Sequence, residues 1–189
     1  MLSLVGWHAD LTPRTYRYAK ASGPDPLHVG WLSKEHPFPT GDVPAAFIER
    51  LDVLVKYGIA NDDTRAFPFL CELCGCARSK EEEIEMASFA EVRAVGADGA
   101  HFVAPMLILH YVTAHRYRPP QAFIDAVLRN ASSRWEDAWA LDLCLSCGSP
   151  MKRLEEPREV IRGDGVRGLL LYVECPTCAA QYPRFTPRP

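Results

Sequence analysis

The chain has 189 residues and a formal net charge of −3 at pH 7, and 48% of its residues are hydrophobic and 24% charged. These proportions are typical of a folded globular protein and exclude a disordered chain or a collagen-like repeat. Its apolar runs are shorter than the roughly 18–20 residues that cross a bilayer, and its N-terminal segment lacks the basic start of a signal peptide. We therefore expect a cytoplasmic protein with no membrane partner.

The charge is spread along the chain. Residues 140–189 hold seven Lys or Arg against six Asp or Glu, a balance of +1, and the remainder holds fourteen against eighteen, a balance of −4. Proteins that bind nucleic acid through its phosphates usually present a concentrated basic face. Nucleic acid is therefore a possible partner of this chain but not the favoured one.

Residues 1–40 are rich in Pro, Gly, Trp and Tyr and show no sustained hydrophobic period. We expect irregular structure here, held by aromatic side chains that pack on the rest of the protein: Trp7, Tyr16, Tyr18 and Trp31. The first helix is predicted to begin at Asp42, a typical N-cap residue, and to end at Gly58. Its apolar residues recur at helical spacing: Phe47, Ile48, Leu51, Leu54 and Val55.

The first cysteine pair, Cys71 and Cys74, has the Cys-x-x-Cys spacing of a zinc knuckle, in which a tight turn points two thiolates at one ion. Disulfides are disfavoured in a reducing cytosol, so metal binding is the favoured use of such a pair. Two strands around the turn 96–99 follow, and then a helix over 106–117 with Pro105 at its start. This order is typical of a treble-clef or ββα zinc finger.

Two histidines on the predicted helix, His110 and His115, complete a site of two cysteines and two histidines with Cys71 and Cys74. Residues five positions apart lie about 140° apart on an ideal helix. The helix must therefore loosen or end near His115 if both rings are to reach one ion.

Three alternatives stay open at this site. Cys76 could replace one histidine as a third thiolate, His110 could be an inert core histidine beside the apolar run 107–109, or the knuckle could hold no metal. If Cys76 is not a ligand, we expect it to be a small buried residue.

Two further helices are predicted after this site. The first covers residues 120–128 and buries Phe123, Ala126 and Val127. The second is short and begins at the capping box of residues 133–136. It ends just before the next cysteine and is expected to connect two zinc modules.

The last four cysteines form two more Cys-x-x-Cys pairs, with 27 residues between the pairs. They are Cys144, Cys147, Cys175 and Cys178. Gly148 follows the first pair and permits the left-handed turn of a zinc knuckle. Two β-rich runs flank the turn 163–165 and predict a hairpin between the pairs. This layout is typical of a zinc ribbon over residues 142–183, and the alternative is redox dithiols or buried free thiols.

The sequence therefore predicts an α+β protein in three parts. Residues 1–132 form a treble-clef or ββα-like zinc module with flanking helices, 133–141 a connecting helix, and 142–189 a small β zinc ribbon. We expect two structural zinc ions, one in each zinc-binding part, because closed sites with four protein ligands leave no position for a substrate.

Several motifs of the first part occur together: Gly30-Trp31-Leu32, residues 36–44, Cys71-Glu72-Leu73-Cys74, Ala104-Pro105, residues 110–115, residues 117–120 and Phe123-Ile124. In this combination they resemble an uncharacterised bacterial family, known from hypothetical proteins of actinobacterial and myxobacterial genomes. The resemblance covers about residues 7–128 and implies that the cysteine pair and the two histidines belong to one module. It implies no activity, and the ribbon lies outside it.

For function, we expect a small non-catalytic interaction or regulatory protein, such as an immunity-type protein, that binds another protein. The segment 36–39 and the ribbon hairpin are the expected contact surfaces. Zinc would act as a structural staple, because a chain rich in Pro and loops has a modest core and metal binding contributes folding free energy.

Two alternatives belong to other functional classes. The ribbon could bind nucleic acid through its arginines and aromatic residues, although acidic residues such as Glu155, Glu156 and Glu159 are interleaved with them. The first module could instead be a ββα-metal nuclease with His101 as general base. A closed site of two cysteines and two histidines gives such a metal no vacancy.

Overall fold

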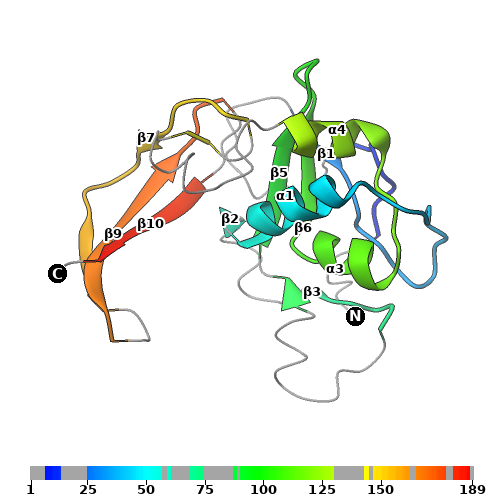
Figure 1. The fold of residues 1–189 in the computed structure, drawn as a ribbon, viewed down its shortest axis with the longest axis horizontal. Coiled ribbons are helices and arrows are strands. Elements are labelled where there is room, and N and C mark those ends of the chain that lie inside the picture. Colours follow the sequence, from blue (N-terminus) through cyan, green and yellow to red (C-terminus); the bar gives the residue numbers. More distant parts are fainter. Residues whose placement is uncertain are drawn as a thin grey trace.

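The computed structural model describes residues 7–13, 25–56, 59–60, 69–74, 87–88, 90–129, 143–144, 147–161, 165–177 and 181–187. Within them the protein is a mixed α+β structure, as the sequence predicts, with three helices and two four-stranded sheets (Figure 1). The predicted connecting helix over 133–141, together with Tyr16, Tyr18, Cys76 and Cys178, lies outside the described residues. Among the described residues no helix combines the length and the apolar character that crossing a bilayer requires.

The first sheet has the strand order β1-β6-β5-β2. Its strands are β1 (Leu27–His28), β2 (Ile59–Ala60), β5 (Ala90–Val95) and β6 (His101–Pro105). β5 and β6 form the hairpin predicted from the turn 96–99, with Val95 opposite His101. The carboxylate of Asp98 accepts the backbone N–H of Ala100 at 3.0 Å and so closes the turn. A separate two-stranded ladder joins β3 (Phe69–Leu70) to β4 (Ala87–Ser88).

Three helices pack with this sheet: α1 (Ala45–Lys56), α3 (Ile108–Ala114) and α4 (Gln121–Arg129). α1 contacts α3, α4 and β5, and it lies in front of β5 and β6 in Figure 1. The core between them contains the side chains predicted from helical spacing, with Phe123 in edge-to-face contact with Phe47 and Phe102. Burial of these aromatic rings is the main stabilising term of this part of the fold.

Two predicted helix starts are wrong. The carbonyl of Pro44 accepts the N–H groups of Phe47 and Ile48, so α1 begins at Ala45, three residues after Asp42. The Asp42 carboxylate instead pairs with Arg116 at 3.0 Å. Pro105 ends β6, opposite Glu91, rather than opening the next helix. Proline tolerates both a strand end and a first helical turn, so the sequence pattern alone did not separate them.

Residues 7–13 are irregular, as predicted, and are held by two isolated bridges, His8 to Trp31 and Pro13 to Leu27, and by ring contacts. Trp31 is buried, and Trp7, which is 41% exposed, stacks on His36 with ring centroids 4.0 Å apart. His8 stacks in the same way on His28, which is fully buried. These contacts attach residues 7–13 to the loop that follows β1.

The second sheet is formed by the C-terminal residues and has β9 at its centre. Its strands are β7 (Lys152–Arg153), β8 (Arg158–Ile161), β9 (Arg167–Glu174) and β10 (Gln181–Pro187). β8 and β9 form the predicted hairpin, and β7 pairs with the other end of β9. Figure 1 shows this sheet extending to one side of the helices. Cys144, Val173 and Cys175 nevertheless belong to the same buried core as the first sheet.

β10 was not among the strands predicted from the sequence, and it contains Pro183 and Pro187. The two prolines are four positions apart, so their missing N–H groups lie on the same edge of the strand. β10 is the last strand in its sheet, where one edge needs no ladder hydrogen bonds, and this position accommodates both prolines.

Candidate metal centre

The cysteine pair Cys71 and Cys74 lies in a tight turn that directly follows β3. Cys71 is buried and Cys74 is exposed, so the turn presents one thiol to the interior and one to the surface. The backbone N–H groups of Leu73 and Cys74 donate to the Cys71 sulfur. Such hydrogen bonds stabilise a thiolate, and this is the geometry expected of a zinc knuckle.

The two histidines come from α3 and from the residue that ends it. α3 stops at Ala114, and His115 leaves helical geometry with φ −110°. The next residue, Arg116, has the left-handed φ of 53°. The helix therefore ends where the five-residue spacing requires, and the two rings come within reach of each other, with His110 Nε2 and His115 Nε2 3.2 Å apart.

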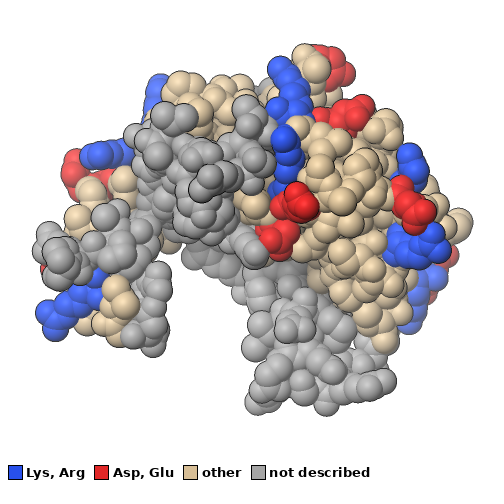
Figure 2. Space-filling model, viewed as in Figure 1, with Lys and Arg blue, Asp and Glu red and all other residues tan. Residues whose placement is uncertain are grey.

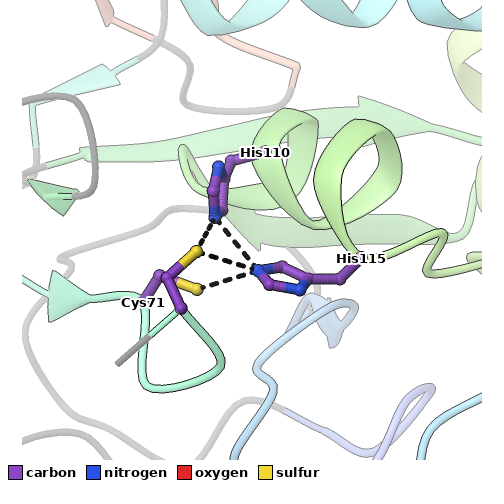
Figure 3. Close-up of side chains that lie close together, drawn as sticks. Cys71, His110 and His115 are labelled. Atoms are coloured by element: carbon purple, nitrogen blue, oxygen red, sulfur yellow. Dashed lines mark hydrogen bonds between the residues drawn. The ribbon is translucent and has the colours of Figure 1, made fainter. Parts of the chain in front are cut away.

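The four side chains converge at one point, and Figure 3 labels three of them, Cys71, His110 and His115. His115 Nε2 lies 3.3 Å from Cys71 Sγ and 3.2 Å from Cys74 Sγ, and His110 Nε2 lies 3.1 Å from Cys74 Sγ. All four ligand atoms lie within 4.8 Å of one another. The structure thus brings together the four residues that the spacing selected, and Cys76 lies outside the described residues.

These separations suit a tetrahedral ion. An ion about 2.3 Å from sulfur and about 2.0 Å from nitrogen holds two nitrogens about 3.3 Å apart and a sulfur and a nitrogen about 3.5 Å apart. The nitrogen–nitrogen distance of 3.2 Å and the sulfur–nitrogen distances of 3.1–3.3 Å are close to these values. The donor set therefore fits a small divalent cation.

The electrostatics of the cluster favour neutral imidazoles. Burial lowers the pKa of His110, with a further contribution from His115, and burial also lowers the pKa of His115. The pKa of the Cys71 thiol is raised to about 11, mainly by burial and also by the neighbouring Cys74, although the backbone hydrogen bonds from Leu73 and Cys74 lower it. A cation that binds here must displace thiol protons, so its affinity falls as the pH falls.

Tyr111 lies beside the cluster and was not selected from the sequence. Its side chain is buried, and its pKa is raised first by burial and then by the charges of Cys71, Glu72 and Cys74. Ser33 Oγ donates to a Glu72 carboxylate oxygen at 3.2 Å, which connects the knuckle to the loop after β1. Local sequence spacing could not predict that Tyr111 lies beside the cysteines or that Ser33 bonds Glu72, because these partners are far apart in the chain.

A second cluster contains three of the four C-terminal cysteines. The Sγ atoms of Cys144, Cys147 and Cys175 lie within 4.8 Å of one another, and Cys147 Sγ is 3.4 Å from Cys175 Sγ. The predicted fourth member, Cys178, lies outside the described residues. Gly148 has the predicted left-handed φ of 73°, and its N–H donates to the Cys144 carbonyl at 2.7 Å.

Among the described residues, the cysteines of both clusters form no disulfide. Cys144 and Cys175 are buried and Cys147 is half-buried. Either cluster could therefore hold a metal ion, and the buried thiols of the second are the less accessible to solvent.

His101, the general base of the nuclease alternative, lies at the start of β6. Burial and the Arg93 charge lower its pKa, and the Cys175 thiolate raises it. His101 is therefore near the second cluster, and it is not part of the first group of converging ligand atoms.

Comparison with known proteins gives one match. The model of a family described as "Domain of unknown function (DUF7919)" matches residues 7–128. No curated protein and no solved structure matches the chain. The matched segment contains the whole first cluster and none of the second.

Proposed function

We propose a function for this chain, which belongs to the DUF7919 family, from the geometry of its own residues. It is a zinc-binding protein with two structural zinc ions, and its folded unit is a non-catalytic module that binds another protein. The observation that carries the proposal is the convergence of Cys71, Cys74, His110 and His115.

Zinc is the metal that this donor set favours. Two thiolates and two imidazoles in tetrahedral arrangement are typical of zinc, whereas magnesium and calcium prefer oxygen ligands. Four protein ligands fill the coordination sphere, which leaves no position for a substrate or a reacting water. A structural role follows from this closed set.

The arrangement of elements supports the same role. The first ligand pair comes from a knuckle, a β-hairpin follows, and the second pair comes from a helix, which is the order of a treble-clef or ββα finger. The second cluster has the knuckle and hairpin of a zinc ribbon, and we propose that Cys178 supplies its fourth thiolate. In both places the ion would join segments that are far apart in the sequence.

A protein partner is supported by the surface of the C-terminal sheet. Leu154, Ile161 and Val166 are exposed around the β8–β9 hairpin, and Ile161 is 64% exposed. On the described part of the face in Figure 2, Lys and Arg lie close to Asp and Glu, and residues 140–189 carry a net charge of only +1, which does not favour phosphate binding. We propose that these three exposed apolar side chains are part of the contact surface for a protein partner.

Metal analysis of the purified full chain tests the proposal. We expect two zinc ions per chain, and we expect a chelator to cause cooperative unfolding, because converging ligands cannot keep their geometry without the ion. A chain that holds no zinc, or that stays fully folded without it, contradicts the structural role. Tight, salt-sensitive binding to nucleic acid at physiological salt contradicts the choice of partner.

A further inference from the structure

The segment that aims His115 is held by more than the helix it follows. The N–H groups of His115 and Tyr117 both donate to the carbonyl of Tyr111, at 3.2 and 3.0 Å. Arg116 between them has a left-handed φ of 53°, which an L-residue adopts only when its surroundings enforce it. The direction of the His115 ring therefore depends on where Tyr117 is held.

Tyr117 is held by a carboxylate from the N-terminal segment. Its side chain is fully buried, and its hydroxyl donates to Asp10 Oδ2 at 2.8 Å. The other oxygen of Asp10 accepts the backbone N–H of Gly30, also at 2.8 Å. Both oxygens of one carboxylate are thus used to join residues 7–13, the loop after β1 and the turn after α3.

Gly30 brings its backbone unusually close to this network. It has a φ of +72°, and a Cβ atom at this position would lie 2.3 Å from Ile108 Cδ1 and 3.2 Å from Tyr117 Cε1. Ile108 is the first residue of α3, and Tyr117 follows its end. Gly30 therefore packs against both ends of α3, the helix that carries His110, and Asp10 holds the segment that follows His115.

We propose that Asp10 is a positioning residue for the metal centre formed by Cys71, Cys74, His110 and His115. Its carboxylate holds Tyr117, and Tyr117 holds the turn that directs His115 at the ion. This inference rests on the proposed function, because it requires that the four side chains bind zinc. Groups that orient a metal ligand from outside the coordination sphere typically change metal affinity by about 10–100-fold.

The burial of Asp10 is consistent with a positioning role. Burial raises the pKa of its carboxyl group, while the hydrogen bonds from Gly30 and Tyr117 lower it. Burying a carboxylate costs free energy unless hydrogen bonds compensate. The free-energy cost of burying Asp10 is therefore offset by the two hydrogen bonds that its carboxylate accepts. Together these two bonds fix the position of Tyr117 relative to Gly30.

The same turn provides a matched control. Asp42 accepts a hydrogen bond from the Arg116 guanidinium at 3.0 Å, so it contacts the residue directly before Tyr117. Its side chain is 93% exposed and that of Arg116 is 70% exposed. Exposed ion pairs of this kind contribute little to stability, so loss of the Asp42 carboxylate should not move the turn.

The test uses the full chain with Co²⁺ in both clusters and a chelator added in steps. Cobalt bound by two thiolates and two imidazoles absorbs differently from cobalt in a thiolate-rich site, so the two sites are followed separately. We expect Asp10→Ala and Tyr117→Phe to weaken cobalt binding at the first site by about 10–100-fold and to leave the second site unchanged. We expect Asp42→Ala to change neither.

Asp10→Asn serves as the conservative variant. Its amide oxygen can accept the Gly30 N–H while its NH₂ group donates to the Tyr117 oxygen, so both connections survive without the charge. We expect its first-site affinity to remain close to that of the unmodified chain. This recovery separates an orienting hydrogen bond from a need for negative charge near the ion.

Equal weakening at both sites would overturn the inference, because it would indicate general destabilisation. Unchanged first-site affinity in both Asp10→Ala and Tyr117→Phe would also overturn it. If Asp10→Ala does not fold, Tyr117→Phe decides the question, since it keeps the ring in the core. An unmodified chain without the two-thiolate cobalt spectrum would overturn the proposed function itself.

Discussion

The two cysteine clusters differ in how the chain assembles them. The first combines a turn after β3 with the end of α3, and its members are up to 44 positions apart, as for Cys71 and His115. The second combines a local knuckle around Gly148 with Cys175 at the end of β9. Cys74 of the first is exposed, whereas Cys144 and Cys175 of the second are buried.

This difference predicts which substitutions should disrupt each cluster. The first cluster depends on the end of α3, on the Asp10 carboxylate and on Gly30. Asp10 and Gly30 are not ligands themselves, so substitutions outside the ligand set should affect this cluster. The second is set by backbone hydrogen bonds within its own knuckle and by burial in the core that it shares with the first sheet. Loss of a ligand there removes both a metal and part of that core.

The largest effect is expected for Cys175→Ser. Cys175 has no exposed surface and belongs to the common core. The variant should lose the zinc of the second cluster, and its free energy of unfolding should fall by about 4–5 kcal/mol or more, a loss that metal removal can cause. Zinc content and denaturant unfolding measure both. A variant that retains two zinc ions would show that Cys175 is not a ligand.

His115→Ala should remove the first zinc and leave the second. We expect one ion per chain and a smaller loss of unfolding free energy than for Cys175→Ser, because the first cluster lies at the surface of its core. Cys76→Ser is the control and should keep both ions. The opposite pattern, with zinc lost only in Cys76→Ser, would establish the three-cysteine alternative.

Substitution of Gly30, near the first cluster, and of Gly148, in the second, compares how tightly the two clusters are packed. In Gly30→Ala the new methyl would collide with Ile108 at a left-handed φ, so we expect a loss of about 2–3 kcal/mol. Gly148→Ala meets no atom within 4 Å and bears only the cost of its left-handed φ, about 1 kcal/mol. Thermal unfolding of both variants checks the order. Equal losses would show that the contact with Ile108 has no energetic weight.

The smallest effect is a dependence on pH at Asp10. Burial raises its pKa above the ordinary 3.8, so the folded protein binds this proton more tightly than the unfolded chain does. The resulting stabilisation is full below pH 3.8 and is lost as the pH rises through the folded pKa. Asp10→Asn should therefore gain in unfolding free energy relative to the unmodified chain as the pH rises through this range. Parallel stability curves for the two proteins would contradict the shift.

Much of the fold could be predicted because its patterns are local. The strands of both hairpins and the apolar faces of α1 and α4 follow from side-chain periodicity, and Gly148 follows from the conformation that a knuckle requires. The helix end near His115 was also predictable, because two rings five positions apart cannot face one ion on a continuous helix.

The errors arose where one residue type serves two local purposes. Pro105 could open a helix or end a strand, and its pairing opposite Glu91 decided for the strand. Asp42 has the side chain of an N-cap, but the pairing with Arg116 uses its carboxylate elsewhere. β10 was not predicted at all, and its two prolines are accommodated because it is an edge strand.

By itself, the sequence determined the ligand types, their spacing and the turns that present them, because thiolate pairs and helix ends are governed by sterics over a few residues. The spacing had also selected His110 and His115, but only the tertiary structure brought them to the cysteines, whereas His28 is buried and stacked on His8. It also placed Asp10 on Tyr117, 107 positions away. Contacts at such separations depend on how the whole core closes, and no short-range pattern encodes that closure.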